Sequence, residues 1–191
     1  MDSATKETIR VLDITGNTDI VAAWYYLLNK DRIPKVFYAD EGQQDILSVL
    51  TWAKTVPRMY GAFIGTALLG LGWIESIVPY NLSTGVTYRA EMGFGFTPNS
   101  TVFQALYGGR MMVDKAFEES TVDFIFGTTP ELNKEAIAYI KRLGFSMYGP
   151  IPNYCSYLGK LSGCYTSYVE RKSWHEYRTK QTSTRFPKAN Q

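Results

Sequence analysis

Residues 121–149 read TVDFIFGTTPELNKEAIAYIKRLGFSMYG and predict a strand, a loop, a helix and a second strand. The run 122–126 is short, β-branched and aromatic, which is typical of a buried strand, and the Gly-Thr-Thr-Pro that follows predicts a break. Within 132–143 the apolar residues recur at spacings of three and four, which predicts one buried helix face. Gly144 follows where a left-handed helix cap favours glycine. A helix between two strands in this way is expected to pack on a sheet.

Sequence patterns in the rest of the chain predict an α+β fold. Strands in series, followed by helix, strand, helix and strand, predict a mixed, mostly antiparallel sheet of six to seven strands with helices on both faces. The predicted strands are 8–12, 60–64, 67–77, 86–96, 145–151 and 164–171, and the predicted helices are 20–28, 44–53 and 103–117. Residues 29–34 are expected to close the first helix, 79–85 to form a connection between strands, and 153–163 to form a loop. Gly108 and Gly109 inside a helix cost about 1 kcal/mol each relative to alanine, and close packing on the sheet is the expected reason.

The composition fits one globular domain. The chain has 191 residues, 45% of them hydrophobic, and a formal net charge of +2, so its charge gives no argument for nucleic acid. We expect a single domain over 1–176 and a basic, solvated, frayed tail over 177–191. A contact between this tail and nucleic acid or an acidic partner is the alternative.

Several classes of protein are disfavoured. The N-terminus lacks the apolar core of a signal peptide, and the longest uncharged run, 59–74, is too short to span a membrane, so we expect a cytoplasmic protein with no membrane partner. Cys155 and Cys164 are expected to be free buried thiols, with pairing across a hairpin as the alternative. His175 is the only histidine, which disfavours a zinc site or a Ser-His-Asp triad, and no metal is expected.

The segments Asn133–Ile137 and Lys141–Phe145 together resemble the N-x-x-A-x-x-x-x-x-K-L-G-F element of the GNAT superfamily of N-acetyltransferases. A helix that only packs on a sheet is the alternative reading of this motif. The resemblance covers residues 86–174, and the N-terminal half follows the family only in its order of elements. It implies a GNAT-like fold and an acetyl-coenzyme A-dependent transfer of an acetyl group to an amine, carried by a small molecule or a protein.

The resemblance also implies where the cofactor would lie. In GNAT enzymes the fourth strand, here 89–96, splays from the fifth, and coenzyme A pairs with its open edge, which would involve the backbone of Phe94 and Phe96. Glu91 falls on the strand where many of these enzymes carry a glutamate base, and burial could raise the pKa of its carboxyl group toward neutrality. The alternative for Glu91 is a surface carboxylate on the outward face.

The pyrophosphate loop departs from the family pattern. GNAT enzymes usually open the helix after the fourth strand with a glycine-rich, cation-containing run, whereas residues 97–102 contain neither glycine nor cation. Asn99, Ser100 and Thr101 are the candidate contacts here, because hydroxyl groups and free N–H groups at a helix start can bind an anion. The resemblance adds Asn133, whose family counterpart often contacts coenzyme A.

The catalytic acid also departs from the pattern. Many GNAT enzymes place a tyrosine where this chain has Ile140, so Tyr139, one residue earlier, and Tyr148 are the candidates.

A second hypothesis is a GNAT-shaped protein without catalysis that works as a binding or assembly component. Degenerate GNAT-like chains without the glycine loop resemble some small proteins of tailed bacteriophages, including internal virion proteins, so a virion location belongs to this hypothesis. Acetyl transfer requires that the two neighbouring strands that contain Glu91 and Phe126 part and leave unpaired peptide groups between them. If they are paired throughout, or if aromatic rings plug the gap between them, acetyl transfer is excluded.

Overall fold

The computed structural model describes residues 8–28, 33–37, 45–82 and 85–185. In this part of the chain, seven strands form one sheet in the order β1-β2-β3-β4-β5-β7-β6. The elements are β1 (Ile9–Asp13), α1 (Thr18–Leu27), α2 (Ile33–Phe37), α3 (Ile46–Ala53), β2 (Arg58–Ile64), β3 (Ala67–Leu82), β4 (Gly85–Phe96), α4 (Val102–Glu118), β5 (Phe124–Pro130), α5 (Lys134–Leu143), β6 (Ser146–Tyr157), β7 (Lys160–Glu170) and α6 (Arg171–Arg185). The predicted α+β class with a mostly antiparallel sheet is confirmed.

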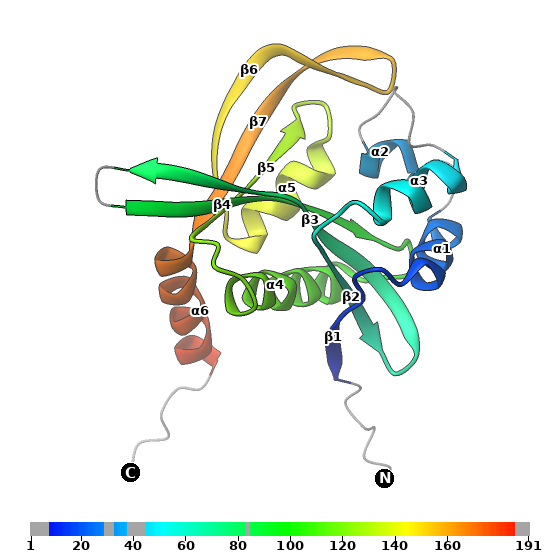
Figure 1. Ribbon diagram of the computed structural model, residues 1–191, viewed down its shortest axis with the longest axis horizontal. Coiled ribbons are helices and arrows are strands. Elements are labelled where there is room, and N and C mark those ends of the chain that lie inside the picture. Colours follow the sequence, from blue (N-terminus) through cyan, green and yellow to red (C-terminus); the bar gives the residue numbers. More distant parts are fainter. Residues whose placement is uncertain (1–7, 29–32, 38–44, 83–84, 186–191) are drawn as a thin grey trace.

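The junction between β4 and β5 divides the sheet. Every other neighbouring pair is antiparallel, whereas β4 and β5 are parallel and pair only over Arg89–Glu91 and Phe124–Phe126. Beyond Glu91, β4 continues to Phe96 alongside β3, and beyond Phe126, β5 continues to Pro130 alongside β7. Figure 1 shows β5, β7 and β6 running away from the second half of β4. The two strands therefore part after Glu91 and Phe126, where the resemblance to GNAT enzymes predicted a gap.

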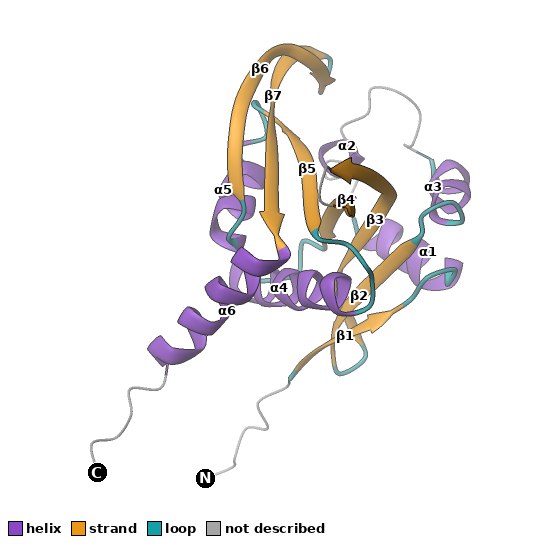
Figure 2. Cartoon of the chain, turned by 60° about the vertical axis from the view of Figure 1, so that its left-hand side comes forward, coloured by secondary structure: helices purple, strands orange, loops and turns teal. Residues whose placement is uncertain are grey.

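Helices cover both faces of the sheet, as predicted (Figure 2). On one face, α4, α5 and α6 bury a large apolar cluster with the central strands, including Met112, Phe117 and Leu143. On the other face, α1 and α3 bury a smaller cluster around Trp24 and Trp73, whose rings meet edge to face at 5.9 Å. The two faces of β4 are therefore buried against different helices.

The glycine pair of α4 is explained by packing, as expected. A Cβ atom on Gly108 would lie 3.1 Å from the Ala62 Cβ atom of β2. A Cβ atom on Gly109 would overlap the hydroxyl group of Tyr139 on α5. These bare positions let α4 approach the sheet and α5 closely.

The expected break after residue 126 is wrong, because β5 continues through Pro130. Pro130 pairs with Cys164 of β7, while the N–H group of the next residue, Glu131, donates to the Gly163 carbonyl at 2.7 Å. Backbone groups alternate between the two edges of a strand, so the Pro130 nitrogen faces the β4 side, where pairing has already ended. Proline is tolerated there because no ladder hydrogen bond is lost.

Two hairpins are longer than predicted. Most of the expected connection 79–85 belongs to the β3–β4 hairpin, in which Pro79 pairs with Tyr88, and residues 83–84 lie outside the described residues. Most of the expected loop 153–163 belongs to the β6–β7 hairpin, which turns at Leu158-Gly159. Tyrosine, leucine and serine give little alternation in this segment, so its strand character was not apparent from periodicity. Residues 29–32, expected to close α1, also lie outside the described residues, and Ile33–Phe37 forms the short helix α2.

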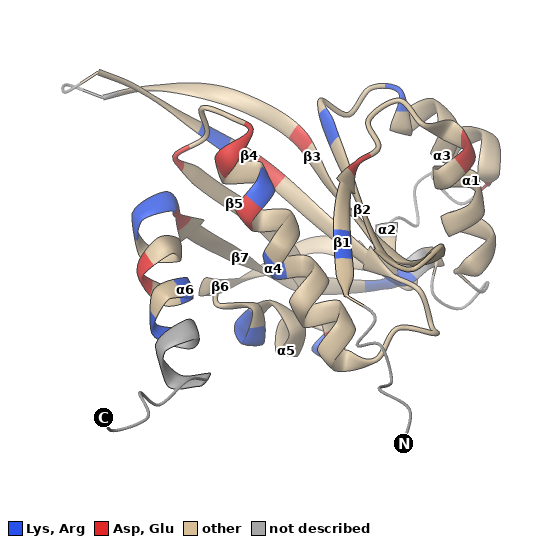
Figure 3. Ribbon diagram, turned by 90° about the horizontal axis from the view of Figure 1, so that it is seen from below, with Lys and Arg blue, Asp and Glu red and all other residues tan. Residues whose placement is uncertain are grey.

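The C-terminal segment differs from the expected frayed tail. The helix α6 begins at Arg171, passes the expected domain boundary at 176 and extends to Arg185. Trp174 is fully buried against Phe145 and donates from its indole N–H to Asp114 at 2.7 Å. Figure 3 shows positive and negative residues interspersed along α6, and Arg178 of this helix also donates to Asp114, at 2.9 Å. Residues 186–191 lie outside the described residues.

Candidate functional site

A cavity of about 460 Å³ lies where β4 has left β5. It is bounded by the end of β4, the start of α4, α5 from its cap to its last turn, and the short helix α2. Its lining residues are Lys35, Val36, Phe94, Gly95, Phe96, Thr97, Ser100, Thr101, Val102, Ala105, Leu106, Asn133, Glu135, Ala136, Ala138, Tyr139 and Arg142. A cavity of this size fits an extended, partly apolar ligand.

The backbone of β4 presents unpaired peptide groups along this cavity. The Thr97 N–H donates to the Leu69 carbonyl of β3 at 2.8 Å. The backbone N–H and C=O groups of the odd-numbered residues of β4 therefore point toward β3. The Tyr88 carbonyl accepts from Asp123 at 2.9 Å, so the even-numbered residues face the β5 side. The N–H and C=O groups of Phe94 and Phe96 therefore point into the gap, where β5 no longer pairs with them.

The start of α4 leaves two N–H groups without an acceptor in the helix. Thr101 caps the helix in a reciprocal capping box, in which its hydroxyl accepts from the Gln104 N–H at 3.2 Å and Gln104 accepts from the Thr101 N–H at 2.8 Å. The N–H groups of Val102 and Phe103 are the remaining first-turn donors. An anion at this end would meet both of them and the positive end of the helix dipole.

Ser100 and Asn133 line the cavity, but their side chains already hold the scaffold together. The Ser100 hydroxyl donates to the Leu69 carbonyl at 2.6 Å. Asn133 caps α5 by accepting from the Ala136 N–H at 3.2 Å, and its amide donates to the Lys35 carbonyl of α2 at 3.3 Å. These side chains shape the walls of the cavity and tie α2 to α5.

Tyr139 lies at the back of the cavity. Its ring packs on Phe94 at 6.0 Å and on Phe96 at 5.7 Å, and its hydroxyl donates to the Ala105 carbonyl at 3.3 Å. Burial raises the pKa of the hydroxyl well above its usual value. The three rings line the cavity without filling it, so the gap is not plugged by aromatic side chains.

Glu91 lies on the other face of β4. Side chains alternate along a strand, so Glu91 shares its face with Gly93, where a Cβ atom would meet the Trp73 indole. Its partner strand carries a bulge between Ile74 and Ser76, and the extra residue is Glu75, which accepts from the Trp73 indole N–H at 2.9 Å. Burial, and secondarily the negative charge of Glu75, raise the pKa of the Glu91 carboxyl group.

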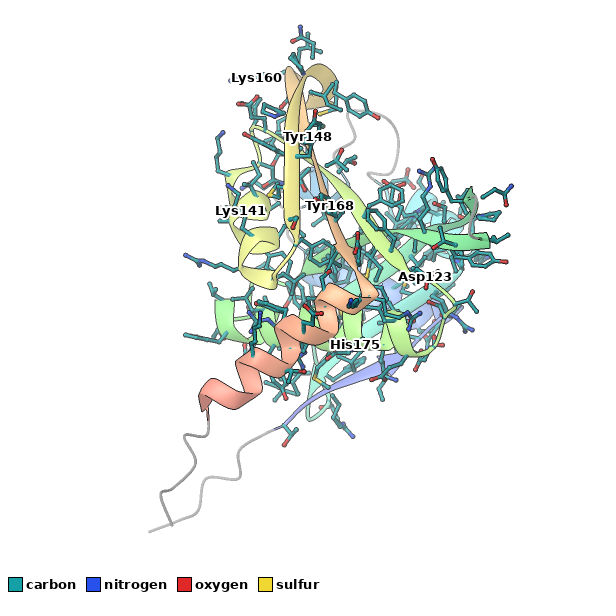
Figure 4. All side chains as sticks on the ribbon, turned by 90° about the vertical axis from the view of Figure 1, so that its left-hand side faces the viewer. Asp123, Lys141, Tyr148, Lys160, Tyr168 and His175 are labelled. Carbon is teal, nitrogen blue, oxygen red and sulfur yellow. The ribbon has the colours of Figure 1, made fainter. Side chains whose placement is uncertain are left out.

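The remaining candidates do not lie in the cavity. Asn99 is exposed and borders a separate depression beside Gln104. Tyr148 is 73% exposed on the edge strand β6, in the β6–β7 hairpin (labelled in Figure 4). The structure thus brings together Phe94, Phe96, Ser100, Thr101, Asn133 and Tyr139, and it separates Asn99, Tyr148 and Glu91 from them.

Two cations of the cavity wall were missed by sequence reasoning. Lys35 comes from α2 and Arg142 from the last turn of α5, and together with the starts of α4 and α5 they favour a negatively charged ligand. Glu135 is the one carboxylate among the lining residues. In the sequence, Arg142 stood out only as part of the Lys141–Phe145 motif, and Lys35 has no periodic or motif signal.

No group of three or more His, Cys, Asp or Glu residues in the described part of the chain could hold a metal ion. No helix within the described ranges combines the length and apolar character that crossing a bilayer requires.

The fold is that of the GNAT acetyltransferases. A probable GNAT-family acetyltransferase from Chromobacterium violaceum superposes with a TM-score of 0.66 at 16% identity, covering 88% of this chain and 91% of that one. Spermidine N-acetyltransferase from Vibrio cholerae, in complex with coenzyme A and spermine, gives 0.64 at 17% identity over 88% and 97% of the two chains.

Ribosomal-protein-S5-alanine acetyltransferase from Vibrio fischeri gives a TM-score of 0.62 at 14% identity, covering 91% of this chain and 99% of that one. No family profile and no curated protein matches the sequence. At these identities the likeness establishes the fold alone.

Proposed function

We propose that the protein is an N-acetyltransferase that uses acetyl-coenzyme A and acetylates an amine. The observation that carries this proposal is the parting of β4 and β5 after Glu91 and Phe126, with a cavity beside the unpaired edge of β4. The neighbours crystallised with coenzyme A and spermine, or described as acting on a ribosomal-protein alanine, support an amine as the acceptor. Both a small amine and a protein N-terminus fit this class.

The residues of the cavity fit acetyl-coenzyme A at three points. The open peptide groups of Phe94 and Phe96 match the two amides of a pantetheine arm. The N–H groups of Val102 and Phe103 suit a pyrophosphate, and Lys35 supplies a cation among the residues that line the cavity. When bound, acetyl-coenzyme A supplies an activated acyl group as a thioester.

Glu91 is the proposed base. It belongs to the last paired position of β4, at the apex of the gap, and its side chain lies on the face opposite the rings of the cavity. A thioester held along β4 would pass through the gap and reach this face. There Glu91 would take a proton from the incoming ammonium group, so that the free amine attacks the acyl carbon. Tyr139 is the candidate acid among the residues that line the cavity. To protonate the leaving thiolate, its hydroxyl would have to give up its hydrogen bond to the Ala105 carbonyl.

Replacing Val102 by proline is expected to weaken acetyl-coenzyme A binding about 10- to 100-fold, because one charge-assisted hydrogen bond is worth about 1.5–3 kcal/mol. Proline is well tolerated at the first helical position, and Thr101 before it has φ −70° and ψ 159°, which proline accepts. The substitution removes one N–H group and leaves the fold intact. Calorimetry measures the dissociation constant, which we expect in the micromolar range for the unsubstituted protein.

Val102→Ala is the matched control, because it shortens the same side chain and keeps the N–H group. Equal weakening in both variants would show that the side chain matters and that the α4 start does not bind the phosphates. Absence of any heat with the unsubstituted protein would overturn the proposed function.

Replacing Glu75 by glutamine is expected to shift the acid limb of the rate profile to lower pH. Glu75 contributes to the raised pKa of Glu91, so removing its charge lowers that pKa and keeps the base ionised in more acidic solution. The pH dependence of kcat/KM for acetyl transfer checks this, with Glu118→Gln, an exposed carboxylate on α4, as the control. An unmoved acid limb would mean that Glu91 does not set it.

A non-catalytic binding or assembly protein is the second candidate. It is favoured by the engaged hydroxyls of Ser100 and Tyr139 and by the exposed apolar residues of the β6–β7 hairpin, Ile151, Tyr154, Leu158 and Leu161. Binding of acetyl-coenzyme A without turnover of any amine would support this candidate.

A further inference from the structure

Two thiols face each other across the β6–β7 hairpin. Cys155 pairs with Ser162 in the register of the two strands, and Cys164 lies two residues further along β7 on the same face. Their Sγ atoms are 2.7 Å apart, which is closer than two unbonded sulfur atoms normally approach. Both thiols are free in this structure, and they are the only two cysteines of the chain.

The two thiols differ in how accessible they are. Cys155 is half-buried, whereas Cys164 is only 4% exposed. Burial, and then the hydrogen bond with Cys155, raise the pKa of the Cys164 thiol to about 12. An external reagent would therefore meet Cys155 first, because the thiolate that is accessible is the one that reacts.

We propose that Cys155 and Cys164 form an intramolecular disulfide by exchange with a low-molecular-weight disulfide such as oxidised glutathione. The Cys155 thiolate attacks one glutathione sulfur, and the first glutathione thiolate leaves. Cys164, after losing its proton to solvent, attacks the Cys155 sulfur of the mixed disulfide and releases the second glutathione. The two cysteines together lose two electrons and two protons, and one glutathione disulfide becomes two glutathione molecules.

The position of the pair connects this modification to the rest of the fold. Cys164 is the register partner of Pro130 at the end of β5, and the neighbouring Gly163 carbonyl accepts the Glu131 N–H. Two residues beyond Glu131, Asn133 caps α5 and lines the cavity. The register between β6 and β7 is interrupted on both sides of Ile151. A covalent bond at Cys155 would therefore fix β6 to β7 where the hydrogen-bond ladder is discontinuous, directly beside the segment that leads into α5.

The test is oxidation of the full-length protein in glutathione buffers of graded ratio. We expect the free thiols, counted after denaturation, to fall from two to none, with a mass loss of two hydrogen atoms and no attached glutathione. Cys155→Ser and Cys164→Ser are the matched variants, and each should stop at a slow, single glutathione adduct or remain reduced. A wild type that carries stable glutathione adducts, forms disulfide-linked dimers or keeps both thiols would overturn the proposal.

Amide exchange tests the coupling to β5 separately. In the wild type, oxidation should slow exchange of the Glu131 N–H with solvent, because its acceptor Gly163 lies next to the bonded cysteine. The same treatment of Cys155→Ser should leave that exchange rate unchanged. Equal rates in the oxidised and reduced wild type would confine the disulfide to the hairpin and overturn its link to the segment before α5.

Discussion

Replacing Trp174 by alanine is expected to lower the free energy of unfolding by about 3–5 kcal/mol, the usual cost of truncating a buried aromatic residue. The Trp174 ring is fully buried between Phe145 and Tyr177, and its N–H group donates to Asp114. Truncation leaves a large void and a carboxylate without this donor. Urea unfolding, followed by circular dichroism, measures the loss.

Glu176→Ala is the matched control, because Glu176 is exposed on the same helix and the helix propensity of glutamate is close to that of alanine. We expect its midpoint to stay close to that of the unsubstituted protein. A Trp174→Ala midpoint equal to the control would mean that α6 does not belong to the folded domain and that the expected tail from residue 177 is right.

Replacing Glu91 by glutamine is expected to lower kcat by about 100- to 10,000-fold, the usual contribution of a general base. The same change should leave stability at neutral pH unchanged or higher. The pKa of Glu91 is raised in the folded protein. The contribution of this carboxyl group to the stability of the fold is therefore fully present below its pKa in the unfolded chain, and it is lost as the pH rises through its pKa in the folded protein. At neutral pH the ionised carboxylate therefore costs stability, and glutamine removes that cost.

Steady-state assays with acetyl-coenzyme A and an amine, together with thermal unfolding, check both parts of this prediction. Glu118→Gln is the control for removing an exposed carboxylate. In the unsubstituted protein the rate should increase with pH through the raised pKa of Glu91, and this limb should vanish in Glu91→Gln. A variant with the original kcat would remove Glu91 from the mechanism.

The fold was predictable because its local signals agree with one another. The apolar spacing and Gly144 mark the same helix, and the structure has Gly144 in the left-handed conformation at its end. Asn133, which the sequence placed inside this helix, caps its start instead. The β4 strand and the long α4 helix likewise follow periodicity. Where propensity was the only guide, as at Pro130 and in residues 153–163, tertiary pairing decided the outcome.

The site was predictable only in part. The backbone of Phe94 and Phe96 could be placed because the resemblance to GNAT enzymes identified residues 89–96 as the strand with the open edge. The functions of Ser100 and Asn133 could not, because their hydrogen bonds go to Leu69 and Lys35, which are distant in sequence. Glu75 was missed because a bulge adds a residue that no alternation marks.

The α6 helix was missed because its composition resembles that of a solvated tail. Its mean hydropathy is low, and Trp174 is its one buried residue within 171–180. A single aromatic anchor gives no periodic signal, and the apolar surface that receives it is assembled from α4 and the β7 side of the sheet. Composition alone therefore could not separate a docked helix from a free end.

The short parallel seam between β4 and β5 has a consequence for how ligand binding and folding are linked. Within the described residues, the register between β4 and β5 consists of three residue pairs, which join the half-sheet β1–β4 to the half-sheet β5–β7–β6. A molecule that hydrogen-bonds along the open edge of β4 while touching α5 would act as an additional strand between the halves. Occupancy of the gap and rigidity of the whole sheet would then rise together, so the ligand would be a structural member of the domain as well as a reactant.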